Sequence, residues 1–275
     1  MKKRIKHIVS IFMMALMTVL VVGPLYWLIV TSLKNESEIY RIPPTLVPAD
    51  LTVENYEYTL TQTGIMKYFL NSVIYVAITL FIVLVCVSLA AFAMSRYRFF
   101  GKRGYLVTIL LSQLMPLTTL IVPLYVSMGK MHLLNTRFSI IAIYVAIQIP
   151  IALWLLIGYF NSIPREIDEA AIIDGCSQIQ VLTRIVIPLA KPGLMAVSLT
   201  IVISVWQELM LAMTFNSKDA LRPLMAGISA SITKAGIKWG QMNATGFIAL
   251  VPIIILYICF QKYLVKGLTG GAVKG

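Results

Sequence analysis

Histidine and cysteine, which supply most metal sites and many catalytic centres, are scarce in this sequence. The chain holds two histidines, His7 and His132, and three cysteines, Cys86, Cys176 and Cys259. Their spacing matches neither a zinc site nor a disulfide framework. A serine nucleophile in the apolar part of the chain would need a histidine there as its base, and neither histidine lies in an apolar run. The sequence therefore argues against an enzyme, including an intramembrane serine protease.

Charged residues are also few, since 12% of the 275 residues are Asp, Glu, Lys or Arg while 59% are hydrophobic. The mean hydropathy of +0.87 exceeds that of ordinary soluble domains, so lipid must be the solvent for most of the chain. Basic residues outnumber acidic ones, 23 to 11, but they fall in short clusters between apolar runs. Anionic headgroups and the rules of membrane orientation explain such clusters, so the net charge does not indicate nucleic-acid binding.

Apolar runs long enough to cross a bilayer as helices occur six times along the chain. The predicted fold class is therefore all-α: a polytopic membrane protein with six transmembrane helices in a single domain, residues 1–275. The expected spans are residues 8–33, 71–95, 104–128, 140–160, 193–215 and 244–264. Prolines inside these runs predict kinks that neighbouring helices absorb, at Pro116, Pro123, Pro150 and Pro252.

Basic clusters predict the orientation of the chain in the membrane. The first run, Ile8 to Leu33, follows four basic residues and lacks the short apolar core and cleavage site of a signal peptide, so we expect a retained anchor. Six spans then place both termini in the cytoplasm. The tightest cluster lies in a short loop that this topology also puts inside: Arg96, Arg98, Lys102 and Arg103.

The loop between the fourth and fifth spans, residues 161–192, carries dense helix signals. Ser162 is a candidate cap for a short helix, and Pro164 suits its first turn. Acidic residues between 166 and 169 favour the positive end of the helix dipole. Asp174 and Gly175 then form a stop signal.

A second short helix is expected directly afterwards. Ser177 and Gln180 have the spacing of a capping box, and this helix should end before Pro188. Two short helices at a bend form a compact knob, on which the small Ala170 and Ala171 would permit close approach of another protein. A solvated helical loop without a partner is the alternative.

Sequence motifs along most of the chain resemble those of the permease subunits of ABC importers, in the carbohydrate-uptake family. EAAIIDG at 169–175, followed by IPLAKPG at 187–193, is similar to the signature cytoplasmic loop of these permeases. The glycine-rich tail at 267–275 resembles that of the shorter, maltose-type permease. Further similar stretches are PLYW at 24–27, SLK at 32–34, Asn55-Tyr56, Asn71-Ser72, AAFAMSR at 90–96 and Ile163-Pro164.

The resemblance implies the fold of a type I ABC importer permease in a bacterial inner or cytoplasmic membrane. It implies a heterodimer with a homologous permease, two ATPase subunits, and an extracytoplasmic sugar-binding protein that delivers the solute. No G-x-x-x-x-G-K-[ST] motif occurs in the chain, so no cofactor is expected here, and the partner ATPases would bind ATP and Mg.

The resemblance also assigns roles to individual residues. In this family the cytoplasmic loop docks into a cleft of the ATPase, and Glu169 would make its main polar contact there. The matching segment for ATPase coupling comprises Glu169, Ala170, Ala171, Asp174 and Gly175.

A candidate for the solute pathway lies in the fifth span, at Trp206, Gln207 and Glu208. A carboxylate within an apolar run is costly and usually faces a cavity or a partner. An aromatic ring beside polar groups suits a sugar, which stacks its apolar faces and hydrogen-bonds its hydroxyls. Gln207 stands where the family usually has Asn, and a structural pair with the sister permease is the alternative role for Glu208.

Two other functions remain open on the residues alone. An ion-coupled secondary transporter would need buried ionisable residues, for which Glu208 is the only candidate within a span. A purely structural membrane scaffold would leave the loop signature and its spacing unexplained.

Overall fold

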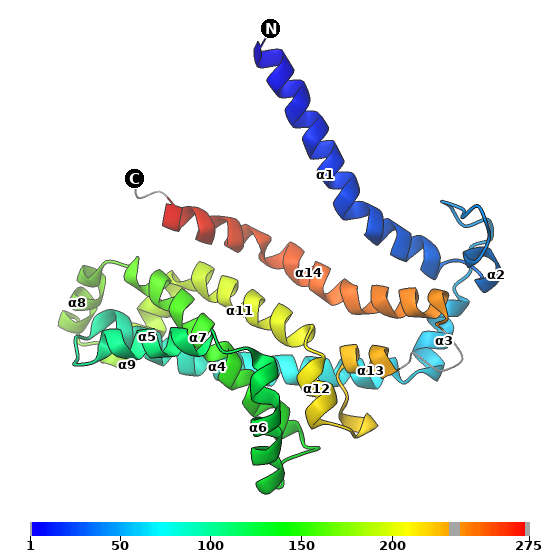
Figure 1. The fold of residues 1–275 in the computed structure, drawn as a ribbon. Coiled ribbons are helices and arrows are strands. Elements are labelled where there is room, and N and C mark those ends of the chain that lie inside the picture. The colour runs from blue at the N-terminus through cyan, green and yellow to red at the C-terminus, as the bar shows by residue number, and fades with distance from the viewer. Residues whose placement is uncertain (1, 231–236, 273–275) are drawn as a thin grey trace. The chain divides into compact units, whose positions relative to one another are not determined.

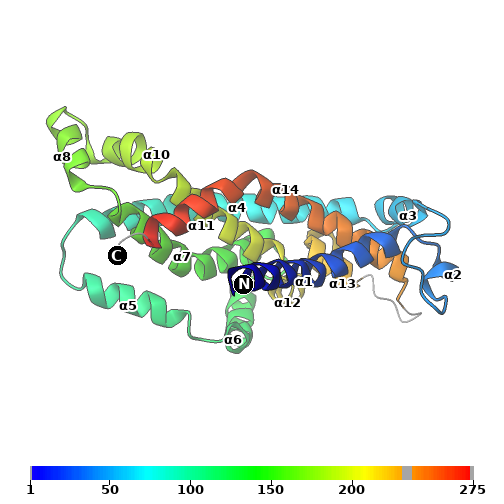
Figure 2. The same ribbon diagram turned by 90° about the horizontal axis from the view of Figure 1, so that it is seen from above.

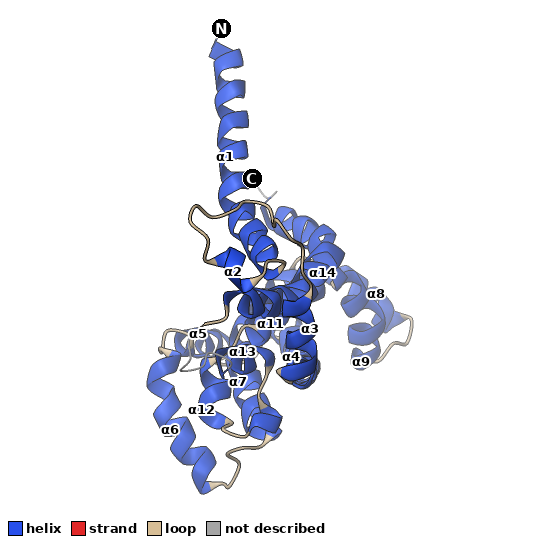
Figure 3. Cartoon of the chain, turned by 90° about the vertical axis from the view of Figure 1, so that its right-hand side faces the viewer, coloured by secondary structure: helices blue, strands red, loops and turns tan. Residues whose placement is uncertain are grey.

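The computed structural model of the chain describes residues 2–230 and 237–272. Those residues form helices joined by loops, with no strand among them (Figure 3), so the predicted all-α membrane fold is confirmed. The helices, in chain order, are α1 (Lys2–Ser32), α2 (Glu36–Ile39), α3 (Glu54–Gln62), α4 (Ile65–Arg96), α5 (Lys102–Ser112), α6 (Leu117–Lys130), α7 (Arg137–Asn161), α8 (Arg165–Ile173), α9 (Gln178–Gln180), the π-helix η1 (Val181–Val186), α10 (Ile187–Leu189), α11 (Lys191–Trp206), α12 (Met210–Phe215), the 3-10 helix η2 (Asp219–Leu221), α13 (Leu224–Ala230) and α14 (Trp239–Ala272).

The chain divides into two compact units. The first comprises Met1–Met66 and Gly227–Pro252, and the second comprises Lys67–Ala226 and Ile253–Gly275. The second unit contains most of α4, all of α5 to α12, and the last part of α14.

Four helical stretches in the described residues are long and apolar enough to cross a membrane: Lys6–Ser32, Ile65–Arg96, Arg137–Asn161 and Trp239–Gln261. The stretch in α1 buries none of its most apolar window within the chain, as expected for a helix that meets lipid on all sides. Two further pairs of helices pass the same test but are bent, so six spans result if each bent pair counts as one.

The span expected at residues 104–128 is broken into α5 and α6, which meet at an angle of 94°. Figure 1 shows α6 turned away from the direction of α5. The break lies at Pro116, whose φ of −60° and ψ of 127° are extended, because proline removes an amide donor and clashes with the preceding turn. By contrast, the helices continue through Pro123, Pro150 and Pro252.

The span expected at residues 193–215 is also interrupted. Helix α11 ends at Trp206, three residues follow outside the helix, and α12 runs from Met210 to Phe215. At its other end α11 follows the preceding helical stretch, Gln178–Leu189, at an angle of 79°.

The core of the second unit lies around α4, α7 and α11, and α7 packs directly on α11. Gly193 at the start of α11 lies against the ring of Tyr159 on α7, so closely that a Cβ there would be 2.2 Å from the ring. Only glycine allows this approach. Other fully buried side chains of this core include Tyr75, Val83, Val87, Ile140, Leu153, Leu156, Phe160 and Ile201.

Segment 216–224 is hydrogen-bonded to two other parts of the second unit. The Asn71 amide on α4 donates to the carbonyls of Ala220 and Arg222, at 2.9 and 3.0 Å. The Asn135 side-chain oxygen accepts from the backbone of Ser217, at 2.7 Å, and of Lys218. Asp219 pairs with Lys67 and accepts from Tyr68, both near the start of α4.

In the first unit, α3 is bonded to the end of α1. The Asn55 amide donates to the carbonyls of Ser32 and Lys34, at 3.0 and 2.9 Å, and the Ser32 and Tyr56 hydroxyls lie 2.6 Å apart. Gly240 packs on Asn55, where a Cβ would be 2.5 Å from the Asn55 side-chain oxygen. The SLK and Asn55-Tyr56 motifs of the sequence are therefore neighbours in the fold.

Candidate functional site

The loop at residues 161–192 forms the knob that the sequence predicts. Helix α8 begins after Pro164, carries Glu166 and Asp168 in its first turn and ends at Ile173. Gly175 follows with a φ of +89°, a left-handed conformation that stops the helix. Figure 2 shows α8 and α10 at one end of the second unit, beyond the ends of α7 and α11.

The helix caps in this loop match the sequence-based prediction at Ser177 and differ from it at Ser162. The Ser177 and Gln180 capping box is present, with both reciprocal hydrogen bonds. The prediction that Ser162 caps α8 is wrong, because its hydroxyl donates to the Tyr159 carbonyl at 2.7 Å and so closes α7. The second helix continues past Pro188 to Leu189, since proline is tolerated in the first turn of α10.

The candidate coupling residues lie mostly at the surface of the knob. Glu169, Ala170, Asp174 and Gly175 are exposed, whereas Ala171 is 7% exposed and packs inward. Apolar side chains surround them in the open, with Ile172 44%, Ile173 85% and Ile179 60% exposed. An exposed apolar patch next to a carboxylate is typical of a protein-binding surface.

A buried ion pair that sequence reasoning missed attaches α8 to α4. The Arg96 guanidinium pairs with Asp168, and both side chains are about nine-tenths buried. Arg96 also donates to the carbonyls of Phe160 and Ile163, at 3.1 and 3.3 Å. Arg165 in turn donates to the Ser95 carbonyl at 2.7 Å. These contacts join the end of α4, the end of α7 and the start of α8.

Glu208 lies in the break between α11 and α12. Its carboxylate accepts from the Tyr144 hydroxyl on α7 at 2.8 Å and from the backbone N–H groups of Leu211 and Ala212, at 2.7 and 3.1 Å. A carboxylate at the N-terminus of α12 satisfies amides that lack partners within the helix and favours the positive end of its dipole. Glu208 therefore stabilises the interrupted conformation of the chain.

The neighbours of Glu208 differ in their surroundings. Trp206 is 5% exposed and packs edge-on against Phe69, with the ring centroids 5.5 Å apart. Gln207 is exposed. One turn earlier, the Gln148 amide on α7 donates to the Ser204 hydroxyl at 2.7 Å and so bridges α7 and α11. Of the predicted pathway residues, Gln207 is thus the one whose side chain is open to its surroundings.

Comparison with protein families settles the kind of protein to which these features belong. Residues 87–270 match the family described as "Binding-protein-dependent transport system inner membrane component". The chain belongs to this family. Its members are permease subunits of ABC importers, so the family expected from the sequence motifs is confirmed.

Individual relatives cover nearly the whole of this permease. The trehalose/maltose transport system permease protein MalG of Thermococcus litoralis is 34% identical over 274 residues, with 98% of each chain covered. The sulfoquinovosyl glycerol transport system permease protein SmoH of Agrobacterium fabrum is 33% identical, with 92% of this chain and 88% of the relative covered. The diacetylchitobiose uptake system permease protein DasC of Streptomyces coelicolor is 31% identical, with 92% of each covered.

The fold of the permease has a counterpart among solved structures. A chain in the crystal structure of a bacterial ABC transporter involved in the import of the acidic polysaccharide alginate superposes with a TM-score of 0.85. The match covers 95% of this chain and 97% of the other at 23% identity. The individual roles assigned to the coupling residues and to residues 206–208 stay predictions.

Proposed function

We propose that this permease forms the membrane pathway of an ATP-driven importer for sugars. Three relatives are named after the transport of a sugar or glycoside, and each matches this chain over at least 88% of its own length. The partners would be a homologous permease, two ATPase subunits that bind ATP and Mg, and an extracytoplasmic sugar-binding protein. Both termini would lie in the cytoplasm of a bacterial cell, in its inner or cytoplasmic membrane.

The observation that carries the proposal is the exposed knob at residues 161–192. Its surface presents Glu169 and Asp174 beside the small Ala170 and Gly175, with exposed isoleucines around them. A carboxylate in such a patch suits a basic or polar group in a cleft of an ATPase subunit, and the small residues permit close approach of the two backbones. Ala171 contributes to coupling indirectly, because its inward packing holds the exposed face of α8 in place.

Attachment of α8 to α4 and α7 gives the knob a means to move the membrane helices. Arg96 and Asp168 form a buried ion pair, and Arg96 is also hydrogen-bonded to the carbonyls of Phe160 and Ile163. A displacement of α8 would therefore be transmitted to α4 instead of being absorbed by the loop. Closure of the ATPase pair would then favour one of two arrangements of the permease through contacts that differ between them.

The solute pathway is proposed to pass the break between α11 and α12. Non-helical backbone at membrane depth is tolerated where protein covers it or where it lines a water-filled cavity. Interrupted helices supply binding sites in many transporters for this reason. Gln207 would meet the solute, whereas Trp206 and Glu208 would hold the break through Phe69 and Tyr144.

The experiment is co-purification of the importer in mild detergent, followed by ATPase and uptake assays of the wild type and of Glu169→Lys. The charge reversal should abolish stimulated hydrolysis or release the ATPase. Glu166→Lys is the matched control, because Glu166 is an exposed acidic residue on the same helix, and it should retain activity. If no ATPase co-purifies with the wild-type chain, coupling through the knob is refuted.

A further inference from the structure

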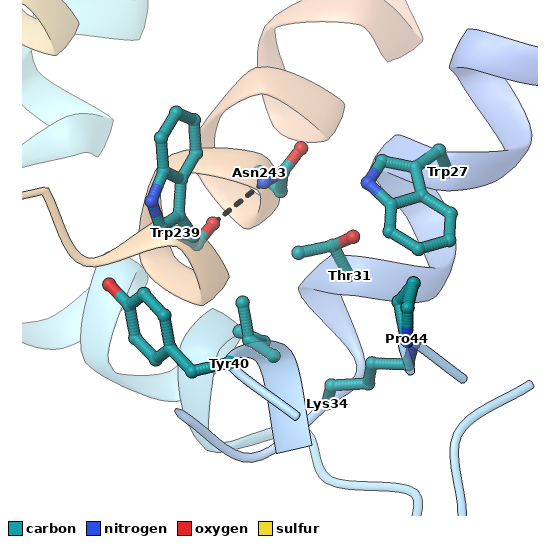
Figure 4. Close-up of a pocket in the computed structure, with 8 residues that line it drawn as sticks. Trp27, Thr31, Lys34, Tyr40, Pro44, Trp239 and Asn243 are labelled. Atoms are coloured by element: carbon teal, nitrogen blue, oxygen red, sulfur yellow. Dashed lines mark hydrogen bonds between the residues drawn. The ribbon is translucent and has the colours of Figure 1, made fainter. Parts of the chain in front are cut away.

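A cavity in the first unit lies between the end of α1 and the start of α14, and the side chains that line it are of the kinds found in ligand-binding sites. Its volume is about 340 Å³, within the range of small-molecule pockets. Three aromatic side chains line it: Trp27 on α1, Tyr40 after α2 and Trp239 on α14. Thr31, Lys34 and Asn243 contribute polar groups to the same wall. Figure 4 shows Trp27 and Trp239 on opposite sides, with Thr31 and Asn243 between them.

The aromatic rings are only partly covered by the chain itself. Trp27 is 41% and Trp239 43% exposed. Tryptophans at the ends of membrane helices usually form a belt in which each ring meets lipid separately. Here the two indoles line one cavity together with polar side chains, which is the arrangement that a ligand with apolar faces and polar edges requires.

The cation beside the cavity is buried and makes its contacts within the chain. Lys34 is 2% exposed, its ammonium donates to the Thr45 carbonyl, and it lies 5.1 Å from the centroid of the Trp27 ring. Among the described residues that line the cavity, Lys34 is the only cation. The described lining residues therefore present no accessible cation to which a phosphate could bind, and the groups left for a ligand are aromatic rings and uncharged polar side chains.

A polar group in the wall has hydrogen-bonding capacity to spare. Thr31 is 5% exposed, and its hydroxyl oxygen is buried without a hydrogen-bond partner in the described part of the chain, so a ligand would reach it only after rotation about χ1. Buried hydroxyls are nearly always paired, so an unpaired one at a cavity wall calls for a partner. Threonine in a helix takes either of two χ1 rotamers, and rotation between them exchanges the positions of its methyl and hydroxyl groups.

We propose that this cavity binds one neutral sugar unit by stacking against Trp27 and Trp239 and by hydrogen bonds to Thr31 and Asn243. The inference rests on the proposed function for the identity of its ligand. In the proposed orientation the cavity lies at the outer ends of α1 and α14, where solute arrives. It is distinct from the break at residues 207–209, which belongs to the second unit.

The test is a tryptophan-fluorescence titration of the full-length chain in lipid nanodiscs with maltose, trehalose and diacetylchitobiose. The wild type should respond to at least one of them. Thr31→Val should weaken that binding about fivefold, the equivalent of one lost hydrogen bond. Trp239→Ala should weaken it by at least about tenfold. Trp154→Phe is the matched control, because Trp154 is an exposed tryptophan on α7, and its affinity should equal that of the wild type.

Several outcomes would overturn the inference. Equal affinity in the wild type and both cavity variants would do so, as would no response to any of the three sugars. A response to phosphatidylglycerol content in place of sugar would identify a lipid site. Uptake by the assembled importer separates this inference from the proposed function: if wild-type uptake is ATP-dependent while the cavity variants bind and transport normally, only the cavity proposal fails.

Discussion

Removal of the carboxylate at Asp168 tests whether the buried pair with Arg96 connects the knob to the membrane helices. Asp168→Ala leaves the guanidinium buried without its counter-ion, and both side chains are about nine-tenths buried in the wild type. Breaking such a pair from one side costs about 3–5 kcal/mol. The carbonyls of Phe160 and Ile163 still accept from Arg96, so the lower end of that range is expected.

The assay has two readouts, unfolding in mixed micelles and the ratio of sugar uptake to ATP hydrolysis in proteoliposomes. Asp168→Ala should lower stability and the uptake ratio together. The double variant Arg96→Met with Asp168→Leu should recover most of the stability, because an apolar pair of similar volume replaces a buried ion pair at little cost, but it should not recover the uptake ratio. Arg98→Met is the control, since Arg98 belongs to the same basic cluster and is exposed.

The refuting result is specific. If Asp168→Ala and Arg98→Met have the same stability within about 0.5 kcal/mol, the pair does not behave as a buried one. If Asp168→Ala is destabilised but hydrolysis and uptake fall in proportion, the pair supports the fold alone, and the transmission of movement through it is refuted.

Three further predictions concern other parts of the second unit. Gly193→Ala should destabilise the protein by about 1–3 kcal/mol, because its Cβ would lie 2.2 Å from the Tyr159 ring. Gly158→Ala, whose Cβ meets no atom within 4 Å, should not destabilise the protein in the same unfolding assay, because alanine is the better helix former. Glu208→Gln should lower the free energy of unfolding by about 1–3 kcal/mol and lower uptake, because the new NH2 group would face a hydrogen-bond donor where a carboxylate oxygen now accepts. Unchanged uptake would contradict a role for the break. A hydrogen bond from Lys67, with a smaller contribution from Tyr68, holds the pKa of Asp219 below its ordinary value of 3.8. A carboxyl group whose pKa is lower in the folded state than in the unfolded state stabilises the fold at pH values above its unfolded pKa. This stabilisation is lost as the pH falls through the folded pKa. Both pH 7 and pH 5 lie above the pKa of Asp219, so the protection of residues 216–224 from hydrogen exchange, corrected for the intrinsic effect of pH, should be equal at about pH 7 and about pH 5. Lower protection at pH 5 than at pH 7 would contradict the pairing.

Local signals in the sequence were sufficient for most of the fold. Long apolar runs predicted helices that are long and apolar enough to cross a membrane, and four such helices are present in the described residues. Asp174-Gly175 predicted the end of α8, and the Ser177 capping box predicted the start of α9. Pro116 was expected to bend its span, and the break lies there. These features depend on residues close together in the chain, so they are visible without the structure.

The interruption after Trp206 could not be predicted in the same way. The sequence there contains neither proline nor glycine, so nothing local ends the helix. The break is stabilised by Glu208, whose partners include Tyr144, 64 residues away on α7. The same holds for the pair of Arg96 with Asp168, because each charge had a sufficient local explanation, one as part of a basic cluster and the other at a helix N-terminus.

The many bonds to segment 216–224 determine what a reporter placed there would measure. Asn71 and Asn135 hold its backbone from two sides, and the exposed Ala220 lies in its middle. A spin label at Ala220→Cys would therefore follow the position of α4 and the start of α7 as one body, not the motion of a free loop. Distances between this label and a second label on the homologous permease, measured in the ATP-bound and nucleotide-free importer, would report the displacement of the helices.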